Sequence, residues 1–175
     1  MLLDFKSMFL RLAYARLKAE VPGGDLYDLT GHLKGFDLLK HRDVTKEATN
    51  ALFFLGGKRW PKRDKKCPDG GAPKSFAQLM PRGTTYPKFV QAVLSKHPAL
   101  KNLIGTSVGH RLMFLESQVL IRTLNLLMDQ NIVALALHDG ILVQASRESE
   151  AVQAMGRASE EVVGVRLGLS TKDLK

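Results

Sequence analysis

The sequence has little cysteine and no long apolar run. Cys67 is the single cysteine among 175 residues, so an intrachain disulfide and a zinc site built from several cysteines are excluded. A lone cysteine is typical of a reducing compartment, and we expect a cytoplasmic location. The longest apolar run falls far short of the roughly 20 residues that cross a membrane, and Asp4 and Lys6 interrupt any signal-peptide pattern.

Common metal and nucleotide motifs are also missing. The five histidines show no metal-ligand spacing. The segment Gly105–Gly109 lacks the Lys-Ser/Thr pair that a phosphate-binding loop needs. A chain of this length is normally one domain, or one core with an inserted subdomain. Function must therefore be sought in polar residues that are far apart in the sequence.

Positive charge is plentiful. The net charge of +9 indicates a polyanionic partner, either nucleic acid or an anionic membrane face. Six cations lie around Trp60 within the irregular segment 58–85, namely Lys58, Arg59, Lys62, Arg63, Lys65 and Lys66. Two interpretations remain open: a solvated, mobile loop, or a loop that contacts phosphates while Trp60 stacks on a base.

Two short apolar runs near the C-terminus flank an acidic turn. Residues 132–137 and 141–145 surround His138-Asp139-Gly140, which predicts a β-hairpin with a tight Asp-Gly turn. Asp139 and Gly140 are accounted for if they only make the turn. However, Asp4 follows the apolar residues 1–3 in the same way, and we expect that strand to be the end of a longer one. Two strand-end aspartates on neighbouring strands would form a pair that holds hard divalent cations.

Apolar periodicity predicts the remaining elements. We expect helices at 7–19, 41–55, 86–95, 111–130 and 146–163, the last capped by Ser146, and a final strand at 165–170. This order indicates an α+β fold with helices on one face of a small sheet. Glu116 interrupts the apolar surface of the longest helix, and three roles stay open for it: a satisfied core carboxylate, a surface residue, or a group facing an active site.

The predicted helix 41–55 carries a regular polar face. Arg42, Lys46, Asn50 and Phe54 recur every four residues and so share that face. Arginine offers phosphate a planar fork and lysine offers a point charge. The face therefore suits a nucleoside triphosphate, or it is an exposed helix surface without function.

Three segments together resemble the family A DNA polymerases. The stretch from Asp4 to Arg11, DFKSMFLR, resembles their first palm motif, and the Arg42, Lys46, Asn50, Phe54 series resembles their fingers helix. The Leu137-His138-Asp139 sequence resembles their last palm motif, and the order is that of the family. Phage-type single-subunit RNA polymerases share these motifs and are the near neighbour. The chain departs from the family at Gly140, where glutamate is usual, at Asn50, where an aromatic or Met is usual, and at Phe54, where tyrosine is usual.

The resemblance implies an architecture. It implies a polymerase-type palm, a small antiparallel sheet packed on helices, with a helical fingers insertion and no thumb. Residues 1–31 would be the first palm segment and residues 111–175 the second. Residues 32–110 would be the fingers-like insertion that contains the basic loop 58–85.

The resemblance also implies a chemistry. Asp4 and Asp139 would bind two Mg²⁺ ions, and Arg42 and Lys46 would hold the triphosphate, with Lys46 a candidate proton donor. The other implied contacts are Asn50 and Phe54 to the nucleotide, His138 to the primer terminus, Arg11 as a brace, and Phe9 as a steric gate that favours deoxynucleotides. The expected partners are a DNA primer-template, dNTPs and other replication subunits, without a membrane.

We therefore expect template-directed nucleotidyl transfer by a DNA polymerase-like unit, a fragment or reduced form of a larger enzyme of phage or mobile-element origin. Two alternatives remain. One is a non-catalytic nucleic-acid-binding protein with a degenerate polymerase fold. The other is an RNA polymerase-like or primase-like enzyme on the same palm.

Overall fold

The computed structural model describes residues 1–54, 59–60, 63 and 74–172, and it divides into two compact units. Unit 1 joins Met1–Ala19 to Arg111–Lys175, and unit 2 is Glu20–His110. Within the described ranges the chain forms one antiparallel sheet of four strands and six α-helices. The predicted α+β class is therefore confirmed. The N-terminal stretch of unit 1 ends at Ala19, whereas the first palm segment was predicted to reach residue 31.

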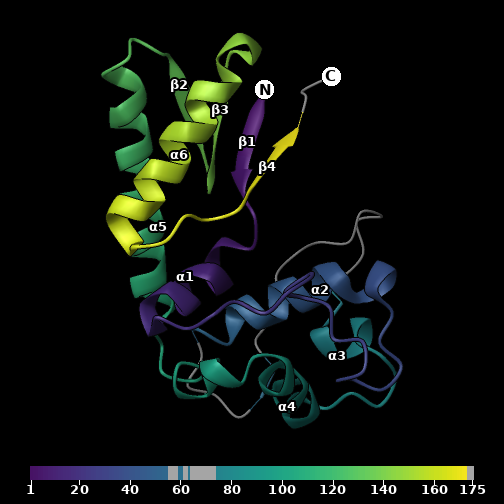
Figure 1. Ribbon diagram of the computed structural model, residues 1–175. Coiled ribbons are helices and arrows are strands. Elements are labelled where there is room, and N and C mark those ends of the chain that lie inside the picture. Colours follow the sequence, from purple (N-terminus) through teal and green to yellow (C-terminus); the bar gives the residue numbers. More distant parts are fainter. Residues whose placement is uncertain (55–58, 61–62, 64–73, 173–175) are drawn as a thin grey trace. The chain divides into compact units, whose positions relative to one another are not determined.

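Unit 1 is built on the sheet (Figure 1). Its strands are β1 (Leu2–Phe5), β2 (Ala134–Leu137), β3 (Gly140–Val143) and β4 (Leu169–Lys172), in the spatial order β2-β3-β1-β4. Each neighbouring pair is antiparallel. The two ends of the chain thus meet in the sheet, where β1 lies between β3 and β4 and is paired on both sides. Leu3 and Phe5 are buried on β1 while Asp4 between them is half-buried, which is the alternation expected of a strand.

The hairpin is confirmed, but its turn differs from the prediction. His138 and Asp139 occupy the turn, with φ of His138 at 53°, and Gly140 already belongs to β3. Gly140 lies opposite Leu137 on one side and Asp4 on the other. A Cβ atom at Gly140 would lie under 3.0 Å from the Leu3 carbonyl oxygen and 3.2 Å from the Asp4 Cα. Glycine is therefore needed here because β1 passes too close for a side chain, not because the turn requires it.

Three helices complete unit 1: α1 (Met8–Leu17), α5 (Gly109–Met128) and α6 (Glu148–Val163). Their buried residues form the core with the sheet, chiefly Met8, Leu12, Leu112, Val119, Leu127, Ile141, Val143, Met155 and Ala158. Arg122 of α5 donates to Glu161 of α6 and ties the two helices together. The predicted Ser146 cap is wrong, because Ser146 lies in a 3₁₀ turn (Ala145–Arg147) and α6 begins after Arg147 without a side-chain cap.

Unit 2 is helical within its described residues. It holds α2 (Leu38–Ala51), α3 (Phe76–Leu79), α4 (Tyr86–Lys96) and a 3₁₀ turn (Pro98–Asn102). The Asp37 carboxylate caps α2 by accepting a hydrogen bond from the Lys40 N–H at 3.1 Å. The core consists of Leu29, Leu33, Val44, Ala48, Leu52, Phe76, Met80, Phe89, Ala92 and Val93. None of the described helices in either unit is long and apolar enough to span a membrane.

Trp60 belongs to this core. Its ring centroid lies 5.9 Å from that of Phe76, 5.5 Å from that of Tyr86 and 5.1 Å from that of Phe89. These contacts half-bury the indole. Part of the Trp60 ring is thus committed to packing against three rings of its own unit, and base stacking by the remaining surface stays a prediction.

Candidate functional site

The two aspartates singled out by the sequence lie close together in unit 1, Asp4 on β1 and Asp139 in the turn that precedes β3. Asp4 pairs with Gly140 of β3 on one side and with Ser170 of β4 on the other. The next residue, Phe5, donates its N–H to the Asp139 carbonyl oxygen at 3.3 Å. Asp139 therefore immediately precedes Gly140, the residue paired with Asp4. Both side chains are half-buried at the point where β1 meets the hairpin turn.

A third carboxyl group reaches the same place from α5. Glu116 is half-buried, and its pKa is raised from the ordinary value of 4.5, first by burial and then by the negative charges of Asp139 and Asp4. The nearby His138 opposes this effect. Like charges raise a carboxyl pKa only when they lie close to it. Asp4, Asp139 and Glu116 therefore share one acidic neighbourhood, in which Glu116 is the half-buried member contributed by α5.

The donor set suits a hard divalent cation. In the ranges that the structure describes, no cluster of three or more His, Cys, Asp or Glu side chains is arranged to hold a metal ion by itself. Magnesium, however, is commonly bound through one or two carboxylates, with water and substrate phosphates completing its octahedral shell. Asp4 and Asp139 are two such carboxylates, and their charges, after burial, raise the pKa of the neighbouring Glu116.

Three further predicted residues lie in unit 1. His138 is exposed in the turn beside Asp139, and Phe9 is half-buried in the first turn of α1. Arg11 is half-buried on the same helix, and a Cβ atom placed on Gly168 would lie 3.6 Å from its Cζ. Gly168 accepts the Lys6 N–H at 2.8 Å just before β4. Arg11 therefore packs between α1 and the chain entering β4, a position that suits a brace.

The cationic face of α2 lies in unit 2. Arg42 donates through Nε to the Asp25 carboxylate, and this hydrogen bond is the main reason that the pKa of Arg42 is raised. Its guanidinium carbon lies 5.8 Å from the centroid of the Tyr27 ring. Asp25 and Tyr27, which the sequence did not single out, thus fix the orientation of Arg42. Lys46, one turn further along α2, is exposed.

The last two members of the predicted face differ from the prediction. Asn50 accepts a hydrogen bond from the Tyr27 hydroxyl at 3.3 Å. Tyr27 therefore contacts both Arg42 and Asn50 of α2. Phe54 is not on the helix, because α2 ends at Ala51. Its ring meets His110 edge-on, with centroids 5.4 Å apart. The four-residue recurrence therefore describes a helix face only from Arg42 to Asn50.

The basic loop is described only in part. Arg59 is exposed, whereas Arg63 donates to Glu47 at 2.7 Å and to the Lys74 carbonyl oxygen at 3.4 Å. Arg63 therefore anchors its segment to α2. The other four predicted nucleic-acid contacts, Lys58, Lys62, Lys65 and Lys66, lie outside the described residues.

No protein-family model, curated protein or solved structure matches this chain. The resemblance to family A polymerases therefore rests on the three sequence motifs alone.

Proposed function

We propose that the chain is a palm-and-fingers unit that catalyses template-directed nucleotidyl transfer of the DNA polymerase type, as a fragment or reduced form of a larger enzyme. The observation that carries the proposal is the acidic neighbourhood of unit 1. There Asp4 of β1 pairs with Gly140, the residue that follows Asp139 of the turn, and burial together with the charges of both aspartates raises the pKa of Glu116.

The aspartates would hold two Mg²⁺ ions. When bound, such ions activate the 3′-hydroxyl of a primer and neutralise the charge on the departing pyrophosphate. The position of Asp4 is fixed by the pairing of β1 with both flanking strands. The position of Asp139 is fixed by the turn that precedes β3. Glu116 adds a carboxyl group from α5. Divalent cations would relieve the mutual repulsion of the three groups, so binding of metal is favoured by charge as well as by ligand type.

Glu116 also bears on the departure from the family at Gly140. The polymerase motif has glutamate after His-Asp, but β1 leaves no room for a side chain at position 140. A carboxyl group supplied by α5 brings a third acid into the same neighbourhood by another route. We propose that Glu116 takes over the electrostatic part of the missing glutamate.

In unit 2, Arg42 and Lys46 would bind the triphosphate. Asp25 occupies the Nε of Arg42, and arginine has five N–H donors, so the terminal nitrogens still offer N–H groups to phosphate. Lys46 would supply a second charge and a proton to the pyrophosphate. Phe9, five residues after Asp4, would act as the gate that favours deoxynucleotides, and His138 would contact the primer terminus.

Primer extension tests the proposal. Wild-type protein with a DNA primer-template, Mg²⁺ and dNTPs should extend the primer, and Asp139→Asn should abolish extension. Asp129→Asn, at an exposed position of unit 1, is the matched control and should be active. Phe9→Ala should admit rNTPs. If Asp139→Asn extends primers as well as the wild type, the acidic pair is not the site of nucleotidyl transfer.

A second candidate is a nucleic-acid-binding protein that has lost turnover. The net charge of +9 and the engagement of Arg42 with Asp25 favour it. It predicts no extension under any condition, together with salt-dependent DNA binding that Asp139→Asn leaves unchanged.

A further inference from the structure

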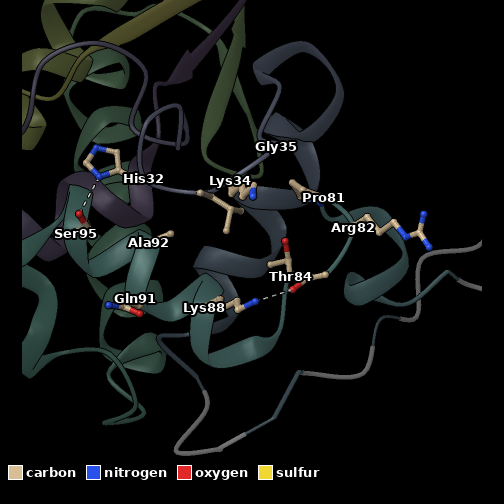
Figure 2. Close-up of a pocket in the computed structure, with 12 residues that line it drawn as sticks. His32, Lys34, Gly35, Pro81, Arg82, Thr84, Lys88, Gln91, Ala92 and Ser95 are labelled. Carbon is tan, nitrogen blue, oxygen red and sulfur yellow. Dashed lines mark hydrogen bonds between the residues drawn. The ribbon is translucent and has the colours of Figure 1, made fainter.

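A cation-lined pocket of about 750 Å³ lies entirely within unit 2 and contains none of the site residues predicted from the sequence (Figure 2). Its described walls are residues 32–35, residues 81–84 and one face of α4. Neither Arg42 nor Lys46 of α2 lines it. The pocket therefore belongs to no site that the polymerase motifs suggest.

The local structure explains how the walls form. Lys88, Gln91, Ala92 and Ser95 follow the spacing of three and four residues that places side chains on one face of a helix. The two loops each contain a glycine with positive φ, Gly35 at 75° and Gly83 at 81°, where a side chain would be strained. A Cβ atom at Gly35 would lie 3.6 Å from that of Pro81, so the loops approach each other at one edge of the pocket.

Hydrogen bonds hold the loops to α4. The His32 imidazole bonds through Nδ1 to the Ser95 hydroxyl at 2.9 Å, and the Lys88 ammonium donates to the Gly83 carbonyl oxygen at 3.4 Å. The Thr84 N–H donates to the Pro81 carbonyl oxygen at 3.0 Å and closes the second loop as a turn. The pocket is thus pre-formed by contacts within unit 2, which lowers the ordering cost of binding.

The electrostatics of the pocket are one-sided. Lys34, Arg82 and Lys88 bring three positive charges, and no described lining residue is acidic. Two acids lie near these segments in the sequence but do not line the pocket. Asp28 accepts the Thr30 N–H at 2.9 Å and interacts electrostatically with His32, and Asp37 caps α2. Figure 2 shows Lys34 and Lys88 beside the space between the loops, whereas the Arg82 side chain at its edge extends outward.

The volume of the pocket and its apolar lining residues limit the class of ligand that it can bind. A volume of about 750 Å³ is in the range of small-molecule and cofactor sites and is much larger than a single phosphate ion needs. Leu33, Pro81 and Ala92 supply apolar surface between the cations. We propose that this pocket binds a nucleotide unit, with Lys34 and Lys88 on its phosphate and the apolar residues against its sugar or base. The unit is either a free nucleotide or part of a nucleic-acid strand.

Titration of the ¹⁵N-labelled full chain, followed by amide chemical shifts, tests this proposal. The probes are inorganic pyrophosphate, thymidine 5′-monophosphate and an oligothymidylate of about ten nucleotides. We expect shifts at residues 32–35 and 81–95. Lys34→Gln and Lys88→Gln should each weaken binding about tenfold, as loss of a charge-assisted hydrogen bond does. Lys101→Gln, at an exposed lysine of unit 2 outside the pocket, should bind like the wild type.

The probes separate the two sources of the nucleotide. Shifts with the monophosphate identify a free nucleotide, and shifts with the oligonucleotide alone identify a strand; both support the pocket. The proposal is overturned if no probe shifts these residues, if pyrophosphate alone shifts them, or if Lys101→Gln weakens binding as much as the pocket variants do. Because Asp139 lies in unit 1, Asp139→Asn should leave these shifts unchanged, and the result is separable from that of the primer-extension assay.

Discussion

Replacing Gly140 by alanine should destabilise unit 1 strongly. The added methyl carbon would meet the Leu3 carbonyl oxygen at under 3.0 Å and the Asp4 Cα at 3.2 Å. Both atoms are backbone of β1, which is paired to β3 and β4 and so cannot swing aside as a flexible side chain would. Overpacking of a tight interior costs about 1–3 kcal/mol, and the rigid neighbours favour the upper half of that range.

A loss of about 2–3 kcal/mol reduces the ratio of folded to unfolded protein about 30- to 150-fold. For a chain of this size it lowers the melting temperature by roughly 4–12 °C. Native-state hydrogen exchange at the amides of β1 and β3 reports on unit 1 specifically. Gly168→Ala is the matched control, because its Cβ atom would make only ordinary contacts of 3.6–3.8 Å with Arg11. Equal exchange rates in Gly140→Ala and wild type would refute the close approach of β1 to β3.

Three other substitutions test charges and contacts. The pKa of Glu116 is raised above 4.5, so the folded chain is most stable, with respect to this group, at pH values below 4.5 where Glu116 is protonated. The unfolding free energy of the metal-free protein should fall as the pH rises through the raised pKa. Glu116→Gln should remove this pH-dependent fall. His97 is buried with its pKa lowered, chiefly by desolvation, from 6.5. Acidification below pH 6.5 should therefore destabilise unit 2, and His97→Gln should flatten that part of the stability profile. Asp25→Asn should lower the unfolding free energy of unit 2 by up to about 1 kcal/mol, since the Arg42 pair is partly exposed; urea denaturation followed by Trp60 fluorescence measures it.

Local patterns in the sequence predict the element types well. Apolar periodicity predicts a helix at 111–130 and a hairpin within 132–145, and the structure has α5 at Gly109–Met128 and strands at Ala134–Leu137 and Gly140–Val143. Helix ends depend on distant partners and are predicted less well. The carbonyl groups of Leu52 and Phe53 accept the N–H groups of Gly105 and Gly109, at 3.2 Å and 2.7 Å, which ends α2 before Phe54.

The residues of the candidate site can be predicted from local sequence patterns, but their long-range contacts cannot. The recurrence of acidic residues after apolar runs predicts Asp4 and Asp139, but no local pattern reveals that Gly140 must leave room for β1. Spacing places Arg42 and Asn50 on one helix face, whereas their contacts with Asp25 and Tyr27 join residues about 20 positions apart. One signal does point to Glu116: it is a single acid on the apolar surface of the longest helix, and such a group needs either a partner or a function.

Titration with Mn²⁺ as a paramagnetic substitute for Mg²⁺ tests the shared acidic site most directly. Electron paramagnetic resonance counts the bound ions, and the broadening of amide signals shows which residues surround them. We predict binding that broadens residues around Asp4 and Asp139 and that is lost in both Asp4→Asn and Asp139→Asn but retained in Asp129→Asn. Binding that survives either of the first two substitutions, or no binding at all, would contradict the assignment of these aspartates as one divalent-metal site.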